Sequence, residues 1–138
     1  MNKDTRKLEI YITRNRHSVN QYTEYEITTI TNLPSFKRNY TVVNRRYSQF
    51  EKLNKELKKY QQKYNKNIYY TDGANKDLVI PSFPGKTGLW VNKYSDSVIE
   101  HRVFMFTNYL RFLSEYLVLC EDREWAKEFV RFLQNDTY

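Results

Sequence analysis

The fold is decided by residues 40–64, which read YTVVNRRYSQFEKLNKELKKYQQKY and change their hydrophobic period partway along. The first seven of these residues are rich in Tyr, Thr and Val, which favour a β-strand. Apolar residues then recur every three or four positions, at Phe50, Leu53, Leu57, Tyr60 and Tyr64. This spacing predicts an amphipathic helix, with Ser48 as its N-cap and Glu51 completing a capping box. A strand that leads directly into a helix indicates an α+β fold.

Two β-rich stretches precede this segment. Residues 8–13 alternate between aliphatic and other side chains, which is the period-two pattern of a half-buried strand. Residues 22–31 are dense in Tyr, Ile and Thr, and the sequence Asn32-Leu33-Pro34-Ser35 after them is typical of a turn. Together with residues 40–46, these stretches predict a three-stranded antiparallel sheet.

The second half of the chain predicts two further helices and two irregular segments. Apolar residues spaced three and four apart run from Ser97 to Leu117, and a shorter set occupies residues 125–133. Residues 65–77 are polar and predict a loop. Residues 80–86 contain two prolines, which favour an extended segment that cannot join a helix or the middle of a sheet.

The composition predicts one domain with an anionic partner. A chain of 138 residues can bury a single core, so we expect residues 1–138 to form one domain, with residues 1–7 as a short N-terminal tail. The formal charge of +7 suits nucleic acid, an acidic protein or an anionic bilayer. Cys120 is the single cysteine, so no internal disulfide can form, and its apolar neighbours predict a buried thiol in the reducing cytoplasm. No apolar run approaches the roughly 18 residues of a membrane span, so we expect any membrane contact to be peripheral.

Patterns of catalysis and metal binding are missing from the sequence. His17 and His101 lie in different segments, and no Cys, His or carboxylate stands at zinc-ligand spacing from them. The tripeptide Gly85-Lys86-Thr87 lacks the upstream glycine of a phosphate-binding P-loop. We therefore expect a protein that is not an enzyme and that requires no cofactor or metal ion.

Four residues from three separate segments are candidates for a basic pocket. Arg46 and Tyr47 stand at the end of a predicted strand, and Lys86 follows the proline segment. Arg102 lies near the start of a predicted helix, where we expect it to face outward. A strand end, a stiff loop and a helix start can enclose a small anion. Side chains alternate along a strand, so Arg45 should point away from this pocket.

These residues resemble the PX (phox homology) domain. Three blocks occur in the family's order and approximate spacing, and they span nearly the whole chain: Arg45-Arg46-Tyr47-Ser48-Gln49-Phe50 with Leu53, Pro81-Ser82-Phe83-Pro84-Gly85-Lys86, and Arg102 with Tyr109-Leu110. Residues 25–27 and 31–37 are also similar to short sorting nexins of the sorting nexin-3 type. The resemblance implies a three-stranded antiparallel sheet packed on a helical subdomain, with the proline-rich segment crossing between helices.

The resemblance also implies a function and a role for each candidate residue. The family binds phosphoinositides, most often phosphatidylinositol 3-phosphate. Arg46 would hold the 3-phosphate, and Tyr47 would stack under the inositol ring. Lys86 would meet the 1-phosphate, and Arg102 would donate to the 4- and 5-hydroxyls. These residue types suit the chemistry, because arginine grips a phosphate with a planar fork of donors whereas lysine supplies a point charge.

A second membrane element and the partners complete the expectation. The apolar tip Leu89-Trp90-Val91 stands between lysines and is predicted to enter the headgroup region. The resemblance implies a peripheral protein of endosomal membranes that works in sorting with retromer and cargo proteins, and we expect a monomer. No signature supports nucleic-acid binding. The alternative is a protein-interaction PX scaffold with weak or no lipid binding, and the intact pocket residues argue against it.

Overall fold

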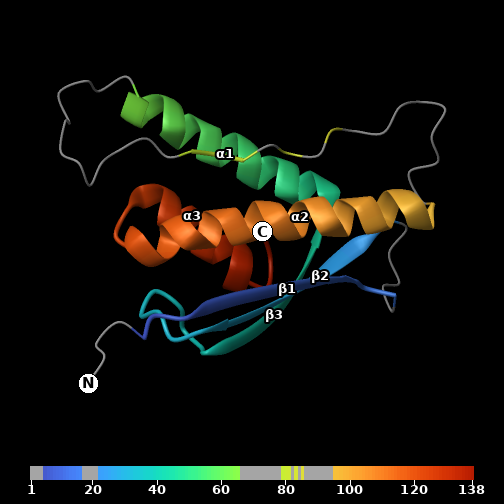
Figure 1. Ribbon diagram of the computed structural model, residues 1–138, viewed down its shortest axis with the longest axis horizontal. Coiled ribbons are helices and arrows are strands. Elements are labelled where there is room, and N and C mark those ends of the chain that lie inside the picture. The colour runs from blue at the N-terminus through green and yellow to red at the C-terminus, as the bar shows by residue number, and fades with distance from the viewer. Residues whose placement is uncertain (1–4, 17–21, 66–78, 82, 84, 86–94) are drawn as a thin grey trace.

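The computed structural model describes residues 5–16, 22–65, 79–81, 83, 85 and 95–138. Three antiparallel strands form one sheet in the order β1-β2-β3 (Figure 1): β1 is Leu8–Arg14, β2 is Glu24–Thr31 and β3 is Tyr40–Arg46. The predicted three-stranded antiparallel sheet is therefore confirmed. The second strand begins at Glu24, two residues later than the composition of the stretch indicates.

Three helices cover one face of this sheet (Figure 1): α1 is Tyr47–Asn65, α2 is Asp96–Leu119 and α3 is Glu124–Gln134. Helix α2 lies against β1, and α3 lies against β3 and α1. This α+β arrangement is the one that the sequence predicts. None of the helices in the described part of the chain is both long enough and apolar enough to span a membrane.

The core lies between the sheet and the helices. Alternation along the strands buries one set of side chains beneath the helices, which includes Ile10, Tyr25, Ile27 and Val43. The helices contribute residues spaced three or four apart, among them Phe50, Leu53, Leu57, Ile99, Phe106, Leu110, Phe129 and Phe132. The helix face opposite the core is polar, and Lys52, Lys55, Lys58 and Lys59 are exposed on α1. The apolar periodicity of α1 therefore predicts its buried face correctly.

The start of α1 differs from the prediction. The helix begins at Tyr47, so Ser48 lies within the first turn and is exposed, and it is not the N-cap. Instead, the side-chain oxygen of Gln49 accepts a hydrogen bond from the backbone N–H of Arg46 at 2.9 Å. This is the return arm of a capping box, shifted by two residues so that Arg46 occupies the N-cap position. The cap therefore fixes the backbone of Arg46 at the junction of strand and helix.

Arg45 is fully buried on β3 and points away from Arg46, as alternation along the strand predicts. Its guanidinium donates hydrogen bonds to the carbonyl oxygens of Phe132 at 3.0 Å and Asn44 at 3.1 Å, and also to that of Asn135. Burial away from water lowers the pKa of Arg45 to about 10. Through these contacts, one strand residue ties the C-terminal end of α3 to β3.

The thiol of Cys120 is not as buried as its apolar neighbours predict. Cys120 is half-buried and follows α2, where its backbone N–H donates to the carbonyl oxygens of Leu117 and Tyr116. Only part of the side chain packs against the core. The prediction is wrong because Leu119, the last apolar residue of the run, is itself 79% exposed. The run therefore leaves the core before it reaches Cys120.

Candidate functional site

Arg46 lies at the end of β3 with its guanidinium against an aromatic ring. The guanidinium carbon is 4.3 Å from the centre of the Tyr22 ring, and both residues are exposed. A cation at this distance over a ring face is attracted by the negative face of the ring. No ion pair joins Arg46 to any other residue in the described part of the chain. Its in-plane N–H donors are consequently available at the surface.

Arg102 forms a second stack of the same kind, with Tyr47. Its guanidinium carbon lies 4.3 Å from the centre of the Tyr47 ring. Arg102 is only 8% exposed, which contradicts the expectation that it faces outward. The reason is its helical position: Arg102 lies three residues after Ile99 and four before Phe106, both of which are in the core, so all three share one face of α2. Among the residues that the structure describes, no carboxylate forms an ion pair with this buried cation.

The ring of Tyr47 packs against an aromatic cluster through Phe83 and Phe106. Phe50 and Phe106 stack face to face, with ring centres 3.8 Å apart. Phe83 lies 5.6 Å from Tyr47 and 5.8 Å from Phe106. Phe83 belongs to the proline-containing segment, so this segment meets α1 and α2 at the site. The cluster buries large apolar surfaces and holds the Tyr47 ring in place.

The phenols at the site remain neutral at physiological pH. Burial raises the pKa of Tyr25, and the guanidinium of Arg102 beside the phenol, first as a hydrogen-bond donor and then as a positive charge, opposes this rise without cancelling it. The pKa of Tyr47 is also raised, first by burial and then by the negative charge of Glu51, while Arg102 again acts in the opposite direction. Because the tyrosines carry no charge, the charges of the described site come from the two guanidinium groups and from the carboxylate of Glu51, which acts on Tyr47.

The structure brings two of the four predicted pocket residues, Tyr47 and Arg102, into contact, and a third, Arg46, directly precedes Tyr47 in the chain. Arg46 and Tyr47 are adjacent at the junction of β3 and α1, and Arg102 joins them from α2 through its contact with Tyr47. Lys86 lies outside the described residues, and so do Leu89, Trp90 and Val91.

Tyr22 is the residue that reasoning from the sequence missed. The register of the sheet pairs Glu24 with Arg46, and Tyr22 stands two residues before Glu24. Residues two positions from a cross-strand partner lie on the same face and within reach of a long side chain. The nearness of Tyr22 to Arg46 can therefore be predicted once residues 22–31 and 40–46 are paired in the correct register. Neither stretch alone indicates it.

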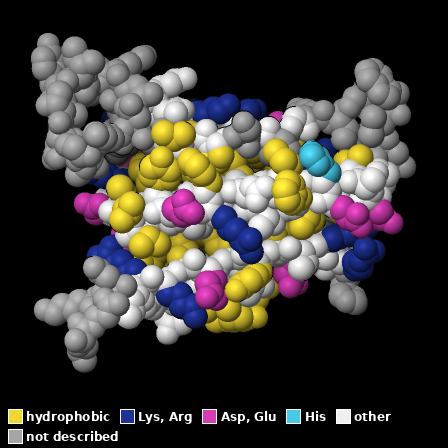
Figure 2. Space-filling view, in the orientation of Figure 1, with side chains coloured by type: hydrophobic (Ala, Val, Ile, Leu, Met, Phe, Trp, Pro, Cys, Tyr) yellow, Lys and Arg dark blue, Asp and Glu magenta, His cyan; other side chains and the backbone are white. Residues whose placement is uncertain are grey.

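On the face of the molecule that carries α2, the described Lys and Arg side chains are interspersed with Asp and Glu (Figure 2). The excess positive charge of the chain therefore does not gather on this face. Arg46 and Arg102 are each a cation with an aromatic partner and without an ion pair among the described residues. Arg45 and Lys52 also lie over aromatic rings, but the donors of Arg45 are used by backbone carbonyl oxygens and Lys52 lies over Tyr138, away from Tyr47 in the chain.

Comparison with known proteins gives a consistent result. A family model described as PX domain matches residues 33–136, a range that includes Arg46, Tyr47 and Arg102. The chain is 33% identical over 121 residues to sorting nexin-3 of Aspergillus oryzae, which covers 88% of this chain and 72% of the relative. It is 34% identical over 117 residues to sorting nexin-3 of Candida glabrata, covering 85% and 63% of the two chains. Over 81 residues it is 40% identical to sorting nexin-3 of Neurospora crassa, covering 59% and 46%.

Proposed function

The chain belongs to the PX domain family, and from this premise we propose that it binds phosphatidylinositol 3-phosphate on endosomal membranes. Membership of this family and similarity to sorting nexins make the chain a phosphoinositide-binding module of protein trafficking. The PX family is a family of binding modules, and no catalytic family matches in its place. The choice of the 3-phosphate headgroup and of the endosome is our proposal, as is the assignment of residues 1–138 to a single PX domain.

The observation that carries the proposal is the pair of stacked guanidinium groups. A salt bridge to a carboxylate would occupy the N–H edge of an arginine, whereas a stack on a tyrosine occupies only its face. The stack on Tyr22 therefore leaves the in-plane donors of Arg46 for a ligand, whereas the edge of Arg102 also lies beside the hydroxyl of Tyr25 and offers a ligand its remaining donors. Arginine donors of this kind bind phosphate oxygens through paired, charge-assisted hydrogen bonds.

The difference in burial supports different roles for the two arginines. Arg46 is exposed, and we assign it to the 3-phosphate, which carries the highest charge of a phosphatidylinositol 3-phosphate headgroup. Arg102 is buried beside Tyr47, and we assign it to the neutral 4- and 5-hydroxyls. The ring of Tyr47 would contact the inositol, with the donors of Arg102 reaching the hydroxyls from beside it.

The remaining assignments rest on the sequence. We propose that Lys86 meets the 1-phosphate, since it stands next to Gly85 at the end of the proline-containing segment that brings Phe83 to Tyr47. Leu89, Trp90 and Val91 follow shortly after Lys86, and we propose that they enter the headgroup region. A phosphate contact and an apolar insertion so close together would bind one membrane surface cooperatively.

The sorting nexin relatives extend the proposal to partners. We propose that the chain acts as a monomer in sorting-nexin-type transport, with retromer and cargo proteins as its partners. This role predicts that lipid and protein ligands occupy different surfaces of the chain. It is tested by adding purified retromer to the protein on phosphatidylinositol 3-phosphate liposomes, where co-sedimentation of the two proteins is expected.

Sedimentation with liposomes that each carry one phosphoinositide tests the lipid assignment. We expect binding to liposomes with phosphatidylinositol 3-phosphate and much weaker binding to the 4- and 5-monophosphates and to phosphatidylserine at equal surface charge. Equal binding to all anionic liposomes would show non-specific attraction by the exposed lysines. Absence of binding to every phosphoinositide would favour a protein-interaction scaffold.

A further inference from the structure

The outer edge of β3 carries unpaired backbone groups. The backbone N–H of Thr31 donates to the carbonyl oxygen of Asn39 at 2.9 Å, and this bond sets the phase of the pairing between β2 and β3. Antiparallel pairing alternates, so Thr41 and Val43 bond to β2 whereas Tyr40 and Val42 direct their N–H and C=O groups to the free edge. No residue in the described ranges forms a hydrogen bond with the backbone of Tyr40 or Val42 along this edge.

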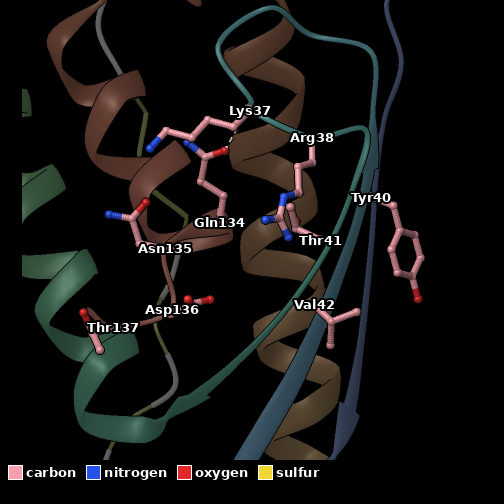
Figure 3. Close-up of a pocket in the computed structure, with 9 residues that line it drawn as sticks. All are labelled: Lys37, Arg38, Tyr40, Thr41, Val42, Gln134, Asn135, Asp136 and Thr137. Carbon is pink, nitrogen blue, oxygen red and sulfur yellow. Dashed lines mark hydrogen bonds between the residues drawn. The ribbon is translucent and has the colours of Figure 1, made fainter.

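A groove of about 600 Å³ runs along this edge (Figure 3). One wall is β3 with Lys37 and Arg38, and the other is the C-terminal segment 134–137. The backbone N–H of Lys37 donates to the side-chain oxygen of Gln134 at 2.9 Å and so joins the two walls at one end. The guanidinium of the buried Arg45 donates a hydrogen bond to the carbonyl oxygen of Asn135 and so joins the second wall to β3. The walls of the groove are therefore held in place without a ligand.

The groove presents charges of both signs. Figure 3 shows the Arg38 guanidinium and the Asp136 carboxylate reaching into the space between the walls, while the side chains of Tyr40 and Val42 point away from it. Arg38 and Asp136 form no ion pair with each other. Lys37 adds a second positive charge beside Arg38 and is also exposed. An occupant would therefore meet a cationic end, a strand edge and one acidic group.

We propose that this groove binds an extended segment of a partner protein, which adds to β3 as a fourth strand. The unpaired groups of Tyr40 and Val42 alternate with paired ones, and only an extended backbone can match that alternation. The segment would be about four residues long and would pair along Tyr40–Val43, which spans roughly 13 Å at strand geometry, because the outward carbonyl oxygen of Asn44 already accepts a hydrogen bond from Arg45. An acidic side chain of the segment would meet Arg38 and Lys37, and a donor would meet Asp136.

The charges also disfavour a second copy of this chain in the register that pairs Val42 with Val42 and Tyr40 with Asn44. Two copies of β3 paired antiparallel about Val42 would place Arg38 of one copy opposite Arg46 of the other. Like charges directly opposite across two strands are destabilising. A foreign segment with an acidic residue at that position turns the same contact into an attraction.

The test uses a displayed library of random peptides, selected on the full chain and then bound to two variants at one position. Val42→Pro removes an outward N–H and spares the pairing of Val43 with β2, whereas the matched Val42→Thr keeps the donor and the β-branched shape. We expect the selected peptides to contain an acidic residue. Their affinity should fall at least tenfold with Val42→Pro and with Arg38→Glu, and it should change little with Val42→Thr.

Retention of liposome binding and of the melting temperature shows that each variant is folded. If Val42→Pro alone fails to fold, selected peptides that are N-methylated at alternate residues replace it, because they lose donors on one edge only. Peptides that bind all forms equally, or a selection that yields none, would overturn the proposal. A dimer that Val42→Pro dissociates would also overturn it, in favour of a second copy. The outcome does not depend on which lipid the chain binds.

Discussion

The guanidinium carbon of Arg102 lies 4.3 Å from the centre of the Tyr47 ring, so a buried cation at this site has an aromatic partner. Arg46 repeats the arrangement on Tyr22 at the same distance. A stack on a ring face compensates part of the cost of removing the cation from water and leaves the N–H edge unused. The two stacks thus orient the arginines while Arg46 keeps its in-plane donors and Arg102 keeps those not directed at the Tyr25 hydroxyl. An anionic, hydroxyl-rich headgroup satisfies such donors.

Replacement of Arg102 by glutamine should weaken binding to phosphatidylinositol 3-phosphate liposomes by about tenfold or more. The expected loss is one charge-assisted contact, which contributes about 1.5–3 kcal/mol. Arg111→Gln is the matched control, since Arg111 is exposed on the same helix. Liposome sedimentation measures both variants, and a thermal melt of each confirms folding. Equal affinities for Arg102→Gln and Arg111→Gln would remove Arg102 from the site.

Replacement of Tyr22 by leucine should weaken the same binding about two- to fivefold. An exposed cation–π contact contributes about 0.5–1 kcal/mol, and its loss frees the Arg46 side chain to leave its bound orientation. Tyr22→Phe keeps the ring and should bind like the wild type. Tyr11→Leu, at another exposed tyrosine, serves as the control. If Tyr22→Phe loses as much affinity as Tyr22→Leu, the hydroxyl and not the ring is responsible.

The order of elements and the buried faces could be predicted because they depend on local periodicity. The strand at residues 40–46 has the predicted bounds, and α1 buries the predicted Phe50, Leu53 and Leu57. The outward orientation predicted for Arg102 was wrong, since Arg102 is buried. A charged residue is expected at the surface unless a partner for it is known, and the aromatic partner of Arg102 is not evident from the sequence of its own helix. That partner, Tyr47, comes from another helix.

Two other features were missed for similar reasons. The stack of Tyr22 on Arg46 depends on the register between two strands, which neither stretch reveals alone. The cap at Gln49 was missed because Ser48 and Glu51 form a motif with the same spacing two residues later. In each case the local pattern allowed several partners, and tertiary packing selected one. The roles of Lys86 and of Leu89, Trp90 and Val91 stay predictions.

Tryptophan fluorescence should report membrane insertion of Trp90. The chain has two tryptophans, and Trp125 is 3% exposed in the core, so its emission should not respond to liposomes. We expect a blue shift on addition of phosphatidylinositol 3-phosphate liposomes and quenching by lipids brominated near the headgroup. Both signals should vanish in Trp90→Phe. A wild-type spectrum that liposomes do not change, although sedimentation shows binding, would contradict insertion.

The stability of the fold should decrease as the pH rises above about 10. Burial raises the pKa of Tyr109 above its ordinary value near 10, so the folded chain keeps this phenol protonated at pH values where the unfolded chain releases the proton. The stabilisation is complete below the unfolded pKa and is lost as the pH rises toward the folded one. Tyr25 and Tyr47 act in the same direction, whereas Arg45, with its lowered pKa, acts in the opposite one.

Urea unfolding at a series of pH values between about 8 and 11 measures this loss. Tyr109→Phe should start from a lower stability, because the hydrogen bond from the Tyr109 hydroxyl to Asn54 is lost. Its stability should nevertheless fall less steeply above pH 10 than that of the wild type. Parallel curves for the two proteins would show that Tyr109 ionises in the folded state as it does in the unfolded chain.

The most direct measurement compares Arg46→Ala, Arg46→Lys and Lys55→Ala on liposomes that contain phosphatidylinositol 3-phosphate. Lys55 is exposed on α1, so Lys55→Ala removes one positive charge without touching the site. We predict that Arg46→Ala abolishes binding and that Arg46→Lys weakens it severely, because an ammonium group cannot reproduce the planar fork of donors. Lys55→Ala should bind nearly as well as the wild type. Binding by Arg46→Ala at the level of Lys55→Ala would contradict the assignment of the site.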